Sequence, residues 1–126
     1  MSVSILLVDD SKFVRKGMSR ELSSVLEGKA VVFSEAVNGN EGLELICTNS
    51  YDLIMLDLTM PEKTGYDVLE ALKEKGIKQK IVVLTADIQP EAKKRVMDLG
   101  AIGYLRKAKP FDREALIRIL KDIGVL

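Results

Sequence analysis

The chain has no histidine, no tryptophan and one cysteine among its 126 residues. The absence of histidine excludes Ser-His-Asp triads, Cys-His nucleophiles and metal sites built on imidazole. The single cysteine, Cys47, cannot form a disulfide within the chain, which favours a reducing compartment. We therefore expect Cys47 to be a small buried residue rather than a reactive one.

Membrane and targeting segments are missing as well. No apolar run approaches the roughly 18 residues that would span a membrane. The first ten residues, MSVSILLVDD, lack the basic start and the long apolar core of a signal peptide. These absences predict a cytoplasmic protein with no membrane insertion.

The chain also lacks net charge, because 19 Lys and Arg residues balance 19 Asp and Glu residues. Charge therefore gives no reason to expect direct binding to nucleic acid or to an anionic membrane. A content of 47% hydrophobic and 30% charged residues is typical of a folded protein. The length fits one compact domain, and no linker or repeat divides residues 1–126.

Short apolar runs alternate with longer segments of helical period along the whole chain. The runs predict strands at 3–8, 30–36, 52–57, 80–86 and 103–107. The segments between and after them predict helices at 11–27, 40–48, 65–75, 90–99 and 112–123. In the first helix we expect Phe13, Val14, Met18 and Leu22 to form the buried face. Strict alternation predicts an α/β fold with a parallel sheet covered on both faces.

Polar residues gather where the predicted strands end. Asp9 and Asp10 follow the first strand, and Asp57, Thr85 and Lys107 end the third, fourth and fifth. The carboxyl ends of parallel strands lie on one edge of a sheet, where ligands bind. Three carboxylates at close range are costly unless a cation neutralises them, and Mg²⁺ is commonly held by carboxylates together with a phosphate. The set predicts a phosphoryl site, with Asp57 able to carry the group as an acyl phosphate.

Four segments carry a family resemblance: ILLVDDS, DLIMLDLTMPEKTGYDVL, IVVLTA and GAIGYLRKAKPF. In this order they resemble the response-regulator receiver domain, the phosphoacceptor module of two-component signalling, over nearly the whole chain. The resemblance implies a flavodoxin-like (βα)5 doubly wound sheet with strand order 2-1-3-4-5. It also implies that Asp57 is phosphorylated, that Asp9, Asp10 and Asp57 hold Mg²⁺, and that the backbone carbonyl of Thr59 completes the protein ligands.

The resemblance further implies that the Thr85 hydroxyl and a lysine bind the phosphoryl group, and that Tyr104 changes rotamer on phosphorylation. The family has lysine and proline adjacent across a cis bond, whereas this chain has two extra residues before the proline. Counting forward from Tyr104 selects Lys107, and counting back from Pro110 selects Lys109. We favour Lys107, which stands where the strand should end, and leave Lys109 and the geometry of its bond to Pro110 open.

A receiver domain of this kind implies a phosphorylation-activated switch, not an enzyme beyond self-catalysed phosphoryl acceptance and slow autodephosphorylation. A sensor histidine kinase would supply the phosphoryl group, and Asp87 and Gln89 would flank the route of the hydrolytic water. With a single helix after the last strand, we expect a monomer with no output domain. It would bind a protein target through the face formed by segments 90–99, 103–107 and 112–123.

Three roles remain open at this stage. The first is a chemotaxis-type regulator that binds a motor or a phosphatase. The second is a phosphorelay shuttle that passes the group to another histidine carrier. The third, more remote, is a small Mg²⁺-dependent phosphatase of the haloacid dehalogenase type, which would need an acid where this chain has Thr59.

Overall fold

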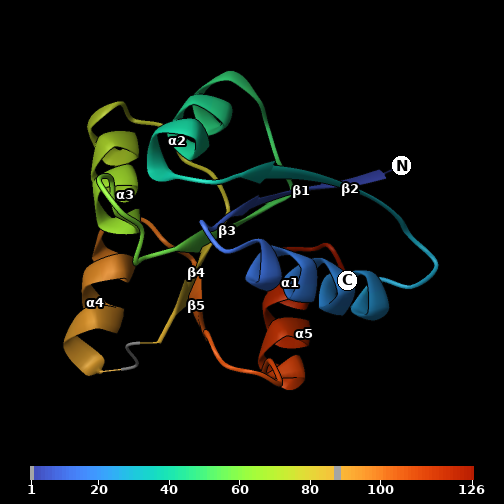
Figure 1. Ribbon diagram of the computed structural model, residues 1–126. Helices are drawn as coiled ribbons and strands as arrows, with labels where there is room; N and C mark the ends of the chain where they lie inside the picture. The colour runs from blue at the N-terminus through green and yellow to red at the C-terminus, as the bar shows by residue number, and fades with distance from the viewer. Residues whose placement is uncertain (1, 87–88) are drawn as a thin grey trace.

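A computed structural model describes residues 2–86 and 89–126, and they form a parallel sheet between two layers of helices (Figure 1). The strands are β1 (Ser2–Val8), β2 (Ala30–Ala36), β3 (Leu53–Asp57), β4 (Ile81–Thr85) and β5 (Gly103–Arg106). All four strand pairs are parallel, and the order across the sheet is β2-β1-β3-β4-β5. The expected flavodoxin-like topology is confirmed.

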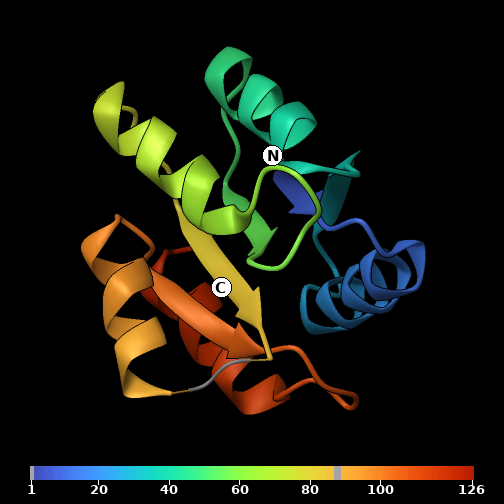
Figure 2. The same cartoon turned by 60° about the vertical axis from the view of Figure 1, so that its left-hand side comes forward.

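Each strand leads into a helix along the chain. The helices are α1 (Lys12–Val25), α2 (Gly39–Thr48), α3 (Gly65–Glu74), α4 (Pro90–Asp98) and α5 (Arg113–Asp122). Helices α1 and α5 cover one face of the sheet, and α2, α3 and α4 cover the other (Figures 1 and 2). The helices are thus divided between the two faces, as in a doubly wound fold.

The two apolar layers follow from the alternation of side chains along each strand. Leu6 and Val8 of β1 point into the layer below α2, α3 and α4, whereas Ile5 and Leu7 point toward α1 and α5. Both faces are covered, so every residue of β3 and β4 is buried. This explains why those strands are continuous apolar runs in the sequence.

The helices begin at polar caps that the sequence supplies. Side chains of Ser11, Asn38, Thr64 and Asp112 each accept a hydrogen bond from a main-chain N–H in the first turn of their helix. Helix α4 instead begins at Pro90, whose missing N–H costs nothing at that position. The caps fix the points at which the chain leaves the functional edge of the sheet.

Two expectations about burial are wrong. Cys47 lies exposed near the end of α2. Phe13 is 70% exposed, whereas the buried residues of α1 are Arg15, Met18 and Leu22. The rest of the expected face is confirmed, since Met18 and Leu22 are buried and Val14 packs against them, but Arg15 is buried in place of Phe13. Within the described ranges, no helix has the length and apolar character needed to cross a bilayer.

Candidate functional site

An acidic cluster lies at the carboxyl edge of the sheet. Asp9 and Asp10 follow β1, and Asp57 ends the neighbouring strand β3. One carboxylate oxygen from each of the three lies within 4.8 Å of the others. Asp9 and Asp57 are buried, at 3% and 1% exposure, while Asp10 is open to solvent. The expected convergence of these three acids is present in the structure.

Lys107 faces the two buried acids from the end of β5. Its Nζ lies 3.0 Å from Oδ2 of Asp9 and 3.1 Å from Oδ2 of Asp57. The main-chain N–H of Lys107 donates to the Thr85 carbonyl at 2.7 Å, which extends the alignment of β5 with β4 by one residue. The lysine therefore reaches the cluster directly from the sheet.

Lys109 points elsewhere. Its Nζ lies 3.8 Å from the centroid of the Phe13 ring on α1, and its side chain passes close to Gly17. The peptide bond between Lys109 and Pro110 is cis, as in the family, although two extra residues precede it. Of the two candidate lysines, the structure brings Lys107 to the acidic cluster and not Lys109.

Burial and neighbouring charges shift the pKa values of Asp57 and Lys107. The pKa of Asp57 is raised, chiefly by burial and then by repulsion from Asp9, although Lys107 and the Thr59 N–H pull it down. Burial opposes the charge on Lys107, but its close contacts with the carboxylates of Asp9 and Asp57 outweigh this and leave the pKa of Lys107 raised. The ammonium thus stays protonated between two carboxylates at neutral pH.

The donor set fits a hard divalent cation. All three candidate side chains offer carboxylate oxygen, the type of ligand that Mg²⁺ prefers. The Oδ2 atoms of Asp9 and Asp57 are buried and accept no hydrogen bond of ordinary geometry from the described residues, so the Lys107 ammonium is the cation that faces them. One ammonium among three acids leaves an excess of negative charge, which a divalent ion would neutralise.

The remaining predicted residues surround this cluster. The main-chain N–H of Thr59 donates to Oδ1 of Asp57 at 3.2 Å. Thr85 is buried at the end of β4, the strand next to Asp57. Tyr104 of β5 is half-buried against the core, and Nζ of Lys93 on α4 lies 4.6 Å from its ring centroid. Gln89 stands just before Pro90, the first residue of α4, and its side chain makes no capping hydrogen bond, whereas Asp87 lies outside the described residues.

The sequence pattern of the response regulator receiver domain matches residues 5–121, which include the whole cluster and Lys107. The chain belongs to this family.

Individual relatives of this receiver domain differ in length. The transcriptional regulatory protein DltR of Streptococcus agalactiae is 34% identical over 90% of this chain, but the match covers only 48% of DltR. The chemotaxis protein CheY of Halobacterium salinarum is 32% identical, with 98% of both chains covered. The solved structure of Vibrio cholerae chemotaxis protein CheY4 has a TM-score of 0.77 at 30% identity and covers 98% of this chain and 99% of its own. The chain thus spans about half the length of the first curated relatives that it matches.

Family membership places this receiver domain in phosphoaccepting signalling, where such domains pair with histidine kinases and output targets. A receiver domain is typically a phosphoacceptor switch rather than a true enzyme. The acidic cluster of this one is typical of a magnesium-binding receiver site.

Two further residues shape this receiver site: Gly65, which lies in the segment DLIMLDLTMPEKTGYDVL that carries the family resemblance, and Arg15, which sequence reasoning missed. A Cβ on Gly65 would lie 2.5 Å from the carbonyl oxygen of Asp57, so the start of α3 can pack there only without a side chain. Arg15 donates to the main-chain carbonyl of Asp9 at 2.7 Å. The spacing of Arg15, Met18 and Leu22, three and four residues apart, is that of one helix face, but spacing alone does not predict that a charged residue is buried.

Proposed function

We propose that Asp57 accepts a phosphoryl group from a phosphohistidine of a sensor kinase in a Mg²⁺-dependent reaction. The observation that carries this proposal is the meeting of Asp57 with Asp9, Asp10 and Lys107 at one edge of the sheet. The Asp57 carboxylate would attack phosphorus while the bond to the histidine nitrogen breaks, and the imidazole keeps the electron pair. An ionised carboxylate has no proton to lose, so a site without histidine needs no general base.

Charge neutralisation would come from two sources. Asp9, Asp10, Asp57 and the carbonyl of Thr59 would hold Mg²⁺, which when bound supplies positive charge to the phosphoryl oxygens. Lys107 would turn from the Asp57 carboxylate to the incoming group, and the Thr85 hydroxyl would donate to it. A cation that already contacts Asp57 at 3.1 Å has only a short way to move.

The acyl phosphate would act as a switch because it adds about 1.5 to 2 negative charges at this edge. Thr85 and Lys107 would be drawn toward the new charge, and Tyr104, on the strand next to Thr85, would change rotamer into the space released. The shift would alter the face formed by α4, β5 and α5. A protein target would bind that face, with no direct contact to nucleic acid.

Similarity over nearly the full length of two chemotaxis proteins supports a chemotaxis-type role, with a motor or a phosphatase as the target. In that role the receiver domain would act as a monomer in the cytoplasm. A phosphorelay shuttle would use the same site, and it remains the alternative. The match to half of a transcriptional regulator supports a further alternative, in which the domain controls an attached partner domain. A magnesium-dependent phosphatase is disfavoured, because Thr59 stands where that chemistry needs an acid.

The test is to incubate the purified chain with acetyl phosphate, with and without Mg²⁺, and to map any mass gain to a residue. We expect one phosphoryl group on Asp57, formed only with Mg²⁺, and none in the Asp57→Asn variant. Asp122→Asn, an exposed acid at the end of α5, is the matched control and should label like the unmodified sequence. Labelling that survives in Asp57→Asn would remove Asp57 from this role.

A further inference from the structure

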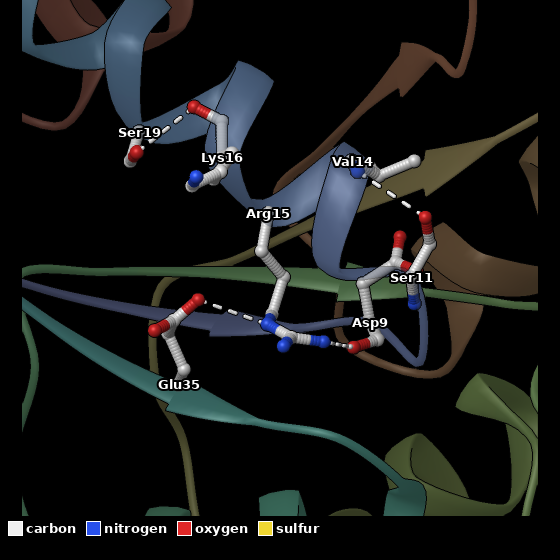
Figure 3. Close-up of polar contacts among 7 residues, drawn as sticks. All are labelled: Asp9, Ser11, Val14, Arg15, Lys16, Ser19 and Glu35. Atoms are coloured by element: carbon white, nitrogen blue, oxygen red, sulfur yellow. Dashed lines mark hydrogen bonds and ion pairs between the residues drawn. The ribbon is translucent and has the colours of Figure 1, made fainter.

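Arg15 is a buried charged residue that the proposed reaction does not use. Its side chain is 10% exposed, and it lies between the turn after β1 and the edge strand β2 (Figure 3). Nη1 donates to the carbonyl oxygen of Asp9 at 2.7 Å, and Nε donates to Oε1 of Glu35 at 2.9 Å. Buried arginine is rare in proteins unless it is paired, and here both pairings are made.

The bond from Arg15 completes a set of contacts that hold Asp9 in place. The Asp9 N–H donates to the carbonyl of Ala36 at 3.1 Å, and Oδ1 of Asp9 accepts from the Ser11 N–H at 2.8 Å. The Asp9 carbonyl accepts from Arg15. One oxygen, Oδ2, is left to face the interior of the acidic cluster, where Lys107 meets it. The backbone of this acid is therefore fixed on both sides.

The other hydrogen bond of Arg15 anchors the guanidinium itself. Glu35 lies on β2 and is paired in register with Leu7 of β1, so the ion pair joins α1 to the sheet edge two residues before Asp9. A guanidinium donates in two directions from one rigid plane. Lysine has a single nitrogen on a flexible stem, so it cannot reproduce both bonds with the same geometry.

We infer that Arg15 is a positioning residue for the cation site: it holds the Asp9 carbonyl and so sets where Asp9 and Asp10 present their carboxylates to a divalent ion. The inference rests on the proposed function, since it takes the acidic cluster as the place where the ion binds. Outer residues that orient metal ligands typically change metal affinity by about 10- to 100-fold. We expect the lower end of that range, because Asp9 keeps its other contacts.

Because Arg15 is positively charged, the direction in which its replacement changes the Mg²⁺ affinity tests the inference. A nearby positive charge repels a divalent cation, so loss of that charge alone would tighten Mg²⁺ binding. Loss of positioning would weaken it. Arg15→Lys keeps the positive charge and loses the paired hydrogen bonds. Arg15→Gln loses the positive charge as well as the paired hydrogen bonds. If positioning dominates, both variants bind Mg²⁺ more weakly than the unmodified sequence.

The experiment is isothermal titration calorimetry with Mg²⁺ on the purified chain at a temperature where every variant is folded. We expect Mg²⁺ to bind about tenfold more weakly to Arg15→Lys and to Arg15→Gln. The matched control is Arg113→Gln on α5. It removes a more exposed ion pair to α1, in which Nη1 of Arg113 lies 3.2 Å from Oε1 of Glu21. This control should bind Mg²⁺ like the unmodified sequence.

A merely structural role for Arg15 would lower the melting temperature and leave the Mg²⁺ affinity unchanged, and that result would overturn the inference. If the Arg15 variants do not fold, Glu35→Gln takes their place, since it weakens the anchor of the guanidinium without removing it. We then expect about threefold weaker Mg²⁺ binding, and unchanged binding overturns the inference. An unmodified chain that binds no Mg²⁺ would instead overturn the proposed function.

Discussion

Replacement of Asp57 by asparagine should stabilise the fold at neutral pH, although it removes the proposed phosphoacceptor. The ionised Asp57 is repelled by Asp9, with oxygens within 4.8 Å, by about 3.5 kcal/mol at an effective dielectric constant of about 20. Attraction to Lys107 at 3.1 Å offsets this by about 5 kcal/mol. The cost of burying the charged carboxylate, several kcal/mol, then decides the sign.

We therefore expect Asp57→Asn to raise the free energy of unfolding by about 2 kcal/mol near pH 8, or the melting temperature by about 5 to 10 °C. The direction agrees with the raised pKa of Asp57, because a carboxyl group that binds its proton more tightly when folded destabilises the fold while ionised. As the pH falls through this raised pKa toward the ordinary value, the carboxyl group is protonated. The difference between the two proteins should then shrink.

The assay is urea denaturation of both proteins in EDTA, at steps from about pH 8 to about pH 4. A control of opposite sign is Asp67→Asn, because hydrogen bonds to Thr64 hold the pKa of Asp67 below its usual value, and this loss should destabilise α3. Added Mg²⁺ should stabilise the unmodified sequence and have much less effect on Asp57→Asn. Equal or lower stability of Asp57→Asn near pH 8 would refute the electrostatic reasoning.

Three other variants test separate parts of the site. Lys107→Met should slow labelling by acetyl phosphate at least about tenfold, because the ammonium that faces the acids is lost. The control Lys109→Met should label at a rate within about twofold of that of the unmodified sequence. Equal labelling rates for the two variants would count against Lys107. Gly65→Ala should lower the free energy of unfolding, measured in urea, by about 1 to 3 kcal/mol, because the added Cβ would overlap the Asp57 main chain. In the control Gly103→Ala, the added Cβ would lie 3.6 Å from the nearest atom, so the free energy of unfolding should change by less than about 1 kcal/mol. Asp10→Asn should weaken Mg²⁺ binding, measured by calorimetry, about tenfold. The stability of the fold should change little, because Asp10 is exposed. An unchanged Mg²⁺ affinity would exclude Asp10 as a ligand.

Much of the fold and of the candidate site could be predicted from local patterns in the chain. Apolar runs of strand length alternate with segments of helical period, and that alternation dictates a parallel sheet. In such a sheet all strands end on one edge, so Asp9, Asp57 and Lys107 were expected to meet without any knowledge of distances. The predicted element boundaries lie within two residues of those in the structure, and the strand order that the family resemblance implied is confirmed.

Details that depend on where one element meets another were not predictable in this way. Lys107 and Lys109 stand at equivalent positions of an extended chain, and only the structure shows that β5 ends at Arg106 and that the chain then carries Lys109 toward Phe13 on α1. The period of α1 was clear, but the choice between Phe13 and Arg15 for its buried stripe was not. A guanidinium is buried at low cost only where hydrogen-bond acceptors surround it. Here the acceptors are the carbonyl of Asp9, directly after β1, and the carboxylate of Glu35 on β2.

The sequence by itself determined the elements, the parallel sheet and the chemical kinds of side chain at the carboxyl edge, because these follow from periodicity and chain order. The strand order was expected only from the family resemblance. Only the tertiary structure decided between Lys107 and Lys109 as the cation that faces Asp57, how closely α3 approaches the Asp57 main chain at Gly65, and which arginine holds Asp9. The physical reason is that a hydrogen bond or ion pair requires two groups within about 3 Å. Residues distant in the chain reach that separation only when the layers pack.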